Sequence, residues 1–333
     1  MGVDADRTAE LEAARARALA RDRFQVELND AHVTTLPFGA CVLGTERAVV
    51  VLSGDDPAAL GGVLLWAERV AAPAVELVAA GAAGLMARRA SVLDPGLRVW
   101  RLDGTDVEPA SPDAPPVPHP VPEGIESLVA IIERSAADVV VEDGIVRAEL
   151  AGLEIARIVA DENGPVLEVG VGRFDREAGA LLHAGRDPET ALGDVIDRLG
   201  PHRRPGAPSH AVNRIGRERW IRHLVVEDPG LVGVHDPVLV EPVPPRRSLL
   251  DDAPASLVAR DGDRAVLVMC SAGVDLGLVP AAVDLVVRHQ PDEVRFVVPE
   301  RDQLPHLERL ASRLPVPATV VGVPPPWDGT RQN

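Results

Sequence analysis

Blocks of apolar residues alternate with helical patterns at both ends of the chain. Residues 47–81 begin with a β-branched apolar run that ends at a small-residue turn, continue as an apolar helix and close with a second apolar run. Residues 264–300 follow the same order, and in both cases a further helix leads to a third apolar run, at 97–102 and 318–323. Strands that alternate with helices indicate a parallel sheet with right-handed crossovers. We predict two similar βαβ-type modules that arose by internal duplication, or else two unrelated units of the same Val- and Ala-rich composition.

The middle of the chain has a different pattern. Apolar residues at helical spacing predict one amphipathic helix over 124–135 and another over 188–199. Between them we predict three short strands, VVVEDGIVRAEL, GLEIARIV and PVLEVGVG, with turn signals at Asp143-Gly144, Gly152 and Asn163-Gly164. Runs of this kind are typical of an antiparallel meander of strands, so we predict an α+β module here.

Two proline-rich stretches divide these patterns into three modules. Proline at this density is incompatible with a helix or an inner strand and favours an extended linker. We therefore predict an α/β protein with an N-terminal module over 1–108, a linker at 109–122, a middle module over 123–240, a linker at 241–247, a C-terminal module over 248–326 and a tail at 327–333.

The chain contains no lysine, so all 34 of its Lys and Arg residues are arginine. Without a side-chain amine no Schiff base can form, and without a Walker A lysine a standard P-loop NTPase is excluded. Arginine keeps its charge and binds carboxylate or phosphate in a fork, but it is a poor proton shuttle. The codon preference of a GC-rich genome would also explain the absence of lysine.

The formal net charge is −17, which argues against general coating of nucleic acid. The N-terminus is a charged helical pattern, and no apolar run approaches the length of a membrane span. Cys41 and Cys270 are far apart and flanked by apolar residues, as expected of reduced core thiols. We predict a cytoplasmic protein that contacts no membrane.

Residues 167–178 (LEVGVGRFDREA) contain the first candidate site. The run from Glu168 to Gly172 resembles the first motif of S-adenosylmethionine-dependent methyltransferases, which implies a glycine turn that admits the cofactor. It departs from that motif at Phe174, where a third glycine is usual, and it follows a hairpin instead of opening a βαβ unit. The sequence therefore does not assign a cofactor to this site.

The predicted helix, meander and following helix also resemble the core of the PD-(D/E)XK nuclease-like fold. That resemblance implies carboxylates on adjacent strands that hold a metal, with Glu154 and Glu168 as the acids. Asp175, later in the same segment, is a further catalytic candidate. Gly170 stands where the lysine of the family tripeptide belongs, so the resemblance implies an inactive or degenerate version of the fold. The alternative is structural: Glu168 pairs with Arg157 across the hairpin, and Asp175 is the N-cap of the next helix.

The second candidate site is an arginine-rich segment, residues 203–222, with six arginines and one acidic residue. Guanidinium groups suit a phosphate or carboxylate ligand. At 100° per residue Arg214 and Arg217 lie on one helical face and Arg219 and Arg222 on another, which is unlike the single basic stripe of a groove-reading helix. The histidines of the region lack metal-ligand spacing, so we predict no metal site. The predicted ligand-binding residues are Arg203, Arg204, His210, Asn213, Arg214, Arg217 and Trp220.

Three functions follow from these patterns. The first is a protein that binds an anionic small molecule at the arginine-rich segment without lysine-dependent catalysis. The second is an enzyme centred on residues 168–175, either methyltransferase-like or a degenerate metal-dependent nuclease. The third is a scaffold or interaction protein with no small-molecule site, in which the arginines pair with the neighbouring acidic modules and hold them together.

Overall fold

The computed structural model describes residues 2–28, 31–162, 164–176, 187–243 and 253–328. The chain forms two compact units. The first comprises residues 1–115, 275–288 and 304–317, and the second comprises residues 116–274, 289–303 and 318–333. The break between residues 115 and 116 falls inside the first proline-rich stretch.

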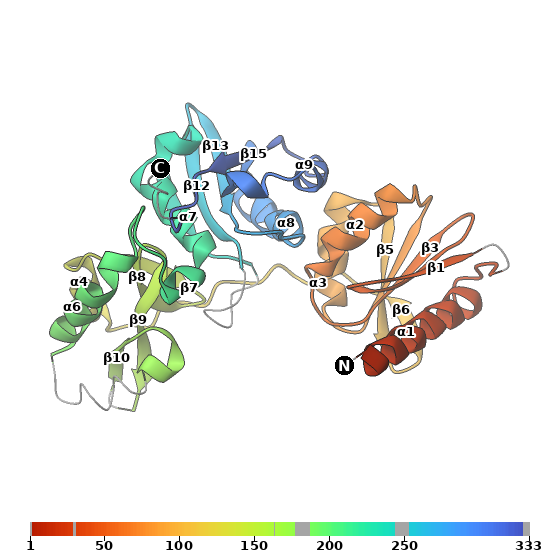
Figure 1. The fold of residues 1–333 in the computed structure, drawn as a ribbon, viewed down its shortest axis with the longest axis horizontal. Coiled ribbons are helices and arrows are strands. Elements are labelled where there is room, and N and C mark those ends of the chain that lie inside the picture. Colours follow the sequence, from red (N-terminus) through yellow and green to blue (C-terminus); the bar gives the residue numbers. More distant parts are fainter. Residues whose placement is uncertain (1, 29–30, 163, 177–186, 244–252, 329–333) are drawn as a thin grey trace. The chain divides into compact units, whose positions relative to one another are not determined.

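The first unit is built on a six-stranded sheet (Figure 1). Its strands in order are β1 (His32–Leu36), β2 (Gly39–Leu43), β3 (Ala48–Leu52), β4 (Val75–Ala79), β5 (Leu97–Asp103) and β6 (Asp106–Pro109). The neighbours β3, β4 and β5 run parallel, and the other pairs are antiparallel. The crossovers between the parallel strands are α2 (Ala59–Arg69) and α3 (Ala83–Leu93), and α1 (Gly2–Asp22) packs Ala16 and Ala20 into the same core.

The first unit also holds most of α8 (Leu278–His289) and all of α9 (Pro305–Ala311). Asp284 of α8 is buried and accepts hydrogen bonds from Arg88 Nε at 2.8 Å and Arg89 Nε at 2.9 Å, both on α3. Because a buried carboxylate without a cation would be costly, this ion pair explains why a charged residue is tolerated in an apolar helix.

The second unit contains a five-stranded sheet near its C-terminal end. Its strands in order are β11 (His235–Val240), β12 (Ala255–Asp261), β13 (Arg264–Cys270), β14 (Glu293–Pro299) and β15 (Ala318–Val323). Two antiparallel pairs are followed by two parallel pairs, as in β1 to β5. The α/β class is confirmed, but the prediction of parallel outer sheets was wrong in part, because an antiparallel hairpin precedes the parallel strands in each. The strand β11 lies in the segment assigned to the middle module, yet it pairs with β12.

The middle sheet of the second unit is an antiparallel meander, as predicted, but it has four strands instead of three, because a turn at Asp143-Gly144 divides the first predicted strand. Its strands are β7 (Asp138–Glu142), β8 (Ile145–Leu150), β9 (Leu153–Asp161) and β10 (Gly164–Val169). The helices α4 (Glu126–Glu133) and α6 (Pro188–Leu199) share an apolar core with this sheet, to which Ile132, Ile155 and Leu192 contribute. At the start of α6, Asp187 accepts a hydrogen bond from the backbone N–H of Thr190, which fixes the N-terminus of the helix.

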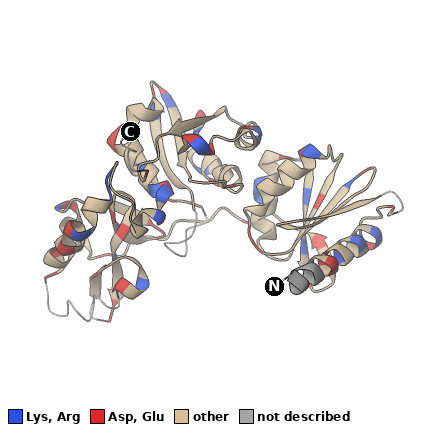
Figure 2. Cartoon of the chain, in the orientation of Figure 1, with Lys and Arg blue, Asp and Glu red and all other residues tan. Residues whose placement is uncertain are grey.

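The arginine-rich segment leads into α7 (Arg217–Glu227), which belongs to the core of the C-terminal sheet. Trp220, Ile221 and Val225 are fully buried in that core, against strands β12 and β13. The remaining polar face of α7 is turned toward the middle sheet, and arginine and acidic positions lie close together there (Figure 2). The helix therefore connects the two sheets of the second unit.

Candidate functional site

One face of the middle sheet is charged, whereas the other is apolar. The charged face carries side chains from all four strands: Asp138, Glu142, Arg147, Glu149, Glu154, Arg157 and Glu168. Directly paired residues of neighbouring strands point to the same side of a sheet, so Asp138, Glu149 and Glu154 form one row across this face and Arg147, Arg157 and Glu168 form another. The register shifts between Ala148 and Glu149, and this β-bulge keeps Glu154 and Arg157 on one face although they are three residues apart.

Arginines neutralise the carboxylates on this face. Glu154 and Glu168 meet at Arg176, whose Nη1 donates to Glu154 Oε1 at 3.2 Å and whose Nε lies 3.5 Å from Glu168 Oε2. Burial lowers the pKa of Arg176, and the neighbouring Arg157 lowers it further. Arg157 Nε donates to Glu168 Oε2 at 3.0 Å, so the predicted pair across the hairpin is confirmed. The two candidate acids are thus brought together, with a guanidinium between them.

Asp175, the third catalytic candidate, lies inside a helical turn over residues 172–176. Its Oδ2 accepts a hydrogen bond at 2.8 Å from the backbone N–H of Val171. The prediction of an N-cap role was therefore wrong, since the carboxylate reaches back from within the turn. Asp175 lines a cavity of about 310 Å³ together with His202 and His210, whose rings stack with centroids 4.0 Å apart.

Arg203 is held by main-chain carbonyl groups. Its Nε donates to the carbonyl of Ala151 at 3.2 Å, its Nη1 to Val212 at 3.2 Å and its Nη2 to Gly216 at 3.1 Å. Its guanidinium also lies 4.1 Å from the ring centroid of Trp220. Burial lowers the pKa of Arg203 to about 9, so the group remains cationic at neutral pH.

The other predicted ligand-binding residues have varied surroundings. Arg217 Nε donates to the carbonyl of Asn213 at 3.1 Å, and its guanidinium lies 4.9 Å from the ring centroid of Trp327. The Asn213 side chain is buried, and neither of its amide atoms has a hydrogen-bond partner within the described part of the chain. Arg204 and Arg214 are exposed. The predicted set therefore does not form one cluster.

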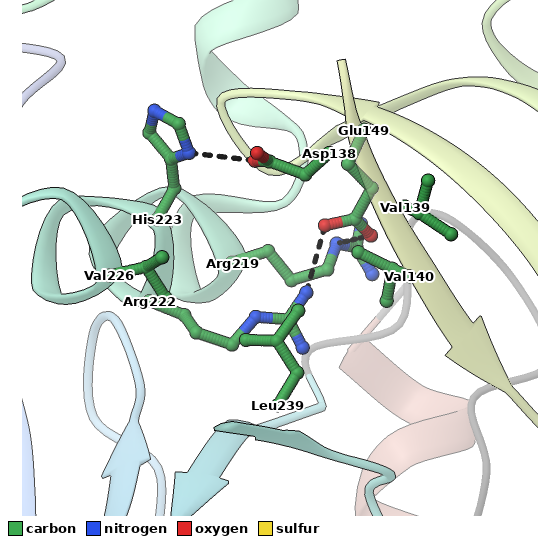
Figure 3. A pocket seen from close by; sticks show the side chains of 9 residues that line it. All are labelled: Asp138, Val139, Val140, Glu149, Arg219, Arg222, His223, Val226 and Leu239. Carbon is green, nitrogen blue, oxygen red and sulfur yellow. Dashed lines mark hydrogen bonds and ion pairs between the residues drawn. The ribbon is translucent and has the colours of Figure 1, made fainter. Parts of the chain in front are cut away.

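Four residues of α7 form a stripe that faces the edge of the middle sheet: Arg219, Arg222, His223 and Val226. They lie at positions i, i+3, i+4 and i+7, which is one face of a helix. Together with Asp138, Val139, Val140 and Glu149 of the sheet and Leu239 of β11, they line a cavity of about 180 Å³, named the α7 cavity below (Figure 3).

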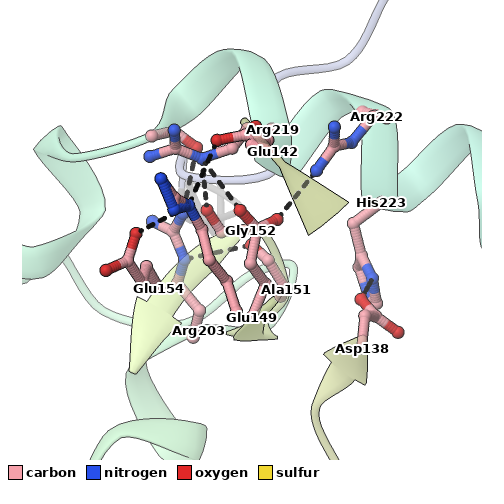
Figure 4. A network of polar contacts seen from close by, with 12 residues as sticks. Asp138, Glu142, Glu149, Ala151, Gly152, Glu154, Arg203, Arg219, Arg222 and His223 are labelled. Carbon is pink, nitrogen blue, oxygen red and sulfur yellow. Dashed lines mark hydrogen bonds and ion pairs between the residues drawn. The ribbon is translucent and has the colours of Figure 1, made fainter. Parts of the chain in front are cut away.

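Glu149 is the central acid of the α7 cavity. Its Oε2 accepts a hydrogen bond from Arg222 Nη2 at 2.8 Å, and its Oε1 lies 3.4 Å from Arg219 Nε. Arg219 Nε also donates to the carbonyl of Gly152 at 3.1 Å (Figure 4). The side chains of Glu149, Arg219 and Arg222 are only 2–3% exposed, so these charges interact in a medium that screens them weakly.

The rim of the α7 cavity carries a histidine–carboxylate pair. His223 Nδ1 lies 2.8 Å from Asp138 Oδ2 (Figure 4), and the two side chains are 23% and 42% exposed. A hydrogen bond of this kind fixes the orientation of the imidazole ring. The cavity therefore presents two guanidinium groups and one imidazole ring beside two carboxylates.

The sequence did not identify the α7 cavity. The sequence feature that could have pointed to the cavity is the i, i+3, i+4, i+7 spacing within residues 219–226, which places these side chains on one face of α7. Asp138 and Glu149 could not be assigned to the site, because their position opposite α7 depends on the packing of two sheets that lie far apart in the sequence.

No family model matches the chain. No curated protein and no solved structure matches it either. The chemistry of the site therefore has to be derived from its own residues.

The described residues contain no group of three or more His, Cys, Asp or Glu side chains placed to hold a metal ion. Among the same residues, no helix combines the length and the apolar character needed to cross a membrane.

The α7 cavity contains a pair of guanidinium groups, which can bind a carboxylate or phosphate in a bidentate fashion.

Proposed function

We propose that the second unit binds a small anionic ligand, bearing a phosphate or carboxylate group, in the α7 cavity. The observation that supports this most directly is that Arg219 and Arg222 both line the cavity from one face of α7. Their guanidinium groups share the carboxylate of Glu149, and a guanidinium has five N–H donors, so the pair has donors beyond those that Glu149 can accept.

The arrangement of charges in the cavity wall supports an anionic ligand, because both guanidinium groups come from α7 and both carboxylates come from the middle sheet. Arg219 and Arg222 contribute guanidinium groups, and His223 contributes an imidazole ring. Glu149 is shared between the two guanidinium groups, and Asp138 is engaged by His223. A bound anion would therefore meet cationic groups on the α7 side of the cavity.

Titration calorimetry with inorganic phosphate and with acetate, at constant ionic strength, tests the proposal. We expect Arg222→Gln to weaken anion binding by about 10- to 100-fold, because a hydrogen bond to a charged group contributes about 1.5–3 kcal/mol. The matched control is Arg214→Gln, which makes the same charge change at an exposed position and should leave affinity unchanged. Absence of binding to the unmodified protein, or equal loss in both variants, would refute a specific site.

A second candidate is the enzyme centred on Glu154, Glu168 and Asp175. Its support is that Glu154 and Glu168 converge on Arg176 from neighbouring strands. As metal ligands or bases they would first have to release their arginines, so this candidate ranks below anion binding. Addition of S-adenosylmethionine, Mg²⁺ or Mn²⁺ should then leave the melting temperature unchanged, and a rise with any of them would favour the enzyme.

Two architectural proposals accompany the function. The shared strand order and direction of β1 to β5 and β11 to β15 support an internal duplication. The charged face of the middle sheet supports a degenerate PD-(D/E)XK-like core that retains acids on adjacent strands but has arginine beside them. A scaffold role is supported by the buried ion pairs, and it would be favoured if no ligand stabilises the protein.

A further inference from the structure

The α7 cavity has room for only a compact ligand. Its volume of about 180 Å³ corresponds to about six water molecules at roughly 30 Å³ each. Cavities that hold nucleotides or other cofactor-sized ligands are typically about 300–1,000 Å³. A ligand of about six non-hydrogen atoms therefore fills it.

The lining of the cavity is divided into a charged part and an apolar part. The guanidinium groups of Arg219 and Arg222 converge on one side (Figure 3). Val140, Val226 and Leu239 contribute hydrocarbon to the remaining wall, from three different elements. The apolar side chains offer no hydrogen bonds, so a fully polar ligand would leave some of its oxygen atoms unsatisfied against them.

We infer that the ligand of the α7 cavity is a short aliphatic carboxylate of about four carbon atoms. This inference rests on the proposed function, since it specifies the anion bound at the same site. The carboxylate pairs with Arg219 and Arg222, and the hydrocarbon chain lies against Val140, Val226 and Leu239. Inorganic phosphate can pair with the two arginines, but it has no hydrocarbon chain to lie against the apolar side chains.

A chain-length series tests this inference on the unmodified protein. Titration calorimetry is carried out with acetate, propionate, butyrate and octanoate, and with inorganic phosphate. Butylammonium is included because it has a similar hydrocarbon tail but a head group of opposite charge. We expect affinity to rise about fourfold with each methylene from acetate to butyrate, as burial of apolar surface predicts. We expect octanoate to bind more weakly than butyrate, because its chain exceeds the cavity. We expect phosphate to bind at least tenfold more weakly than butyrate, and butylammonium not to bind.

A pair of variants on β11 locates the binding. Leu239→Phe enlarges a side chain of the cavity wall and should abolish butyrate binding. Val238→Phe is the matched control, because Val238 is the neighbouring residue and is 60% exposed. If Leu239→Phe fails to fold, the chain-length series still decides the question.

The outcomes separate the two proposals. Phosphate binding tighter than butyrate, or an affinity independent of chain length, would overturn the short-carboxylate inference and leave anion binding in place. Equal loss of butyrate binding in Leu239→Phe and Val238→Phe would also overturn it. If neither phosphate nor any carboxylate binds, anion binding itself is refuted.

Discussion

Glu149 lies between two buried guanidinium groups, so its removal should be among the most damaging single changes in the second unit. Its side chain and that of Arg219 are both 2% exposed, and Arg222 is 3% exposed. Glu149→Gln keeps the size and one oxygen acceptor but removes the charge. Two arginines then lose a carboxylate partner in a poorly hydrated environment. Breaking a buried pair in this way costs about 3–5 kcal/mol, and we expect the lower part of that range because the amide oxygen can still accept one hydrogen bond.

Urea unfolding followed by tryptophan fluorescence measures this loss. With a slope of about 1–3 kcal/mol per molar urea, a loss of about 3 kcal/mol lowers the unfolding midpoint by about 1–3 M. Hydrogen exchange over residues 138–161 would show whether the destabilisation is confined to the second unit. Because domains are stable by only about 5–15 kcal/mol, the expected loss is a large part of the total.

The control for this experiment is Glu189→Gln. Glu189 accepts a hydrogen bond from Arg134 Nη2 at 2.9 Å, but both side chains are more than half exposed. Exposed ion pairs contribute about 0–1 kcal/mol, so the urea midpoint should hardly move. If Glu149→Gln and Glu189→Gln had equal effects, the view that Glu149 is the essential counter-ion of α7 would be refuted.

Three further predictions follow from individual contacts. Gly216→Ala should destabilise the second unit by about 1–3 kcal/mol in urea unfolding, because φ is +58° and a Cβ would lie 2.7 Å from Arg219 Nη2; an unchanged midpoint would refute the close approach. A hydrogen bond from Arg295 lowers the pKa of Glu293 below its ordinary value of 4.5, so the stabilisation is present above that value and is lost as pH falls through the lowered pKa. Thermal melting between pH 6 and pH 3 should show this loss, which should be smaller in Arg295→Met. Burial raises the pKa of Cys270 to about 12, so a thiol reagent at pH 8 should modify it only after unfolding, and rapid labelling of the native protein would contradict its burial.

The local patterns of the chain were sufficient to predict the middle sheet. Turn residues separate its strands, and the Glu168–Arg157 pair follows from the register of one hairpin. The hairpins that precede the parallel strands were missed for a physical reason. In β1 the sequence HVTTL is mostly exposed and has no continuous apolar run, so it carries little periodic signal.

Sequence patterns predict less of the candidate site than of the fold. The arginine-rich segment was recognised as one positively charged stretch, but its members have different environments. Arg203 is buried against carbonyl groups, whereas Arg214 is exposed. Arg219 and Arg222 reach Glu149, which is about 70 residues away in the chain. Spacing along a helix can indicate which arginines share a face, but the partner of that face is set by tertiary packing.

The absence of lysine has a physical consequence at these buried positions, whatever its origin in codon usage. Burial lowers the pKa of Arg203 to about 9, which still leaves the side chain charged at neutral pH. A lysine has an ordinary pKa of about 10.4, so desolvation at the same place would bring its pKa closer to neutral pH. Only a planar guanidinium can also donate to three separate carbonyl groups while it stacks on Trp220. Arginine therefore suits this buried position better than lysine would, because its higher pKa withstands the desolvation and its fork reaches several acceptors at once.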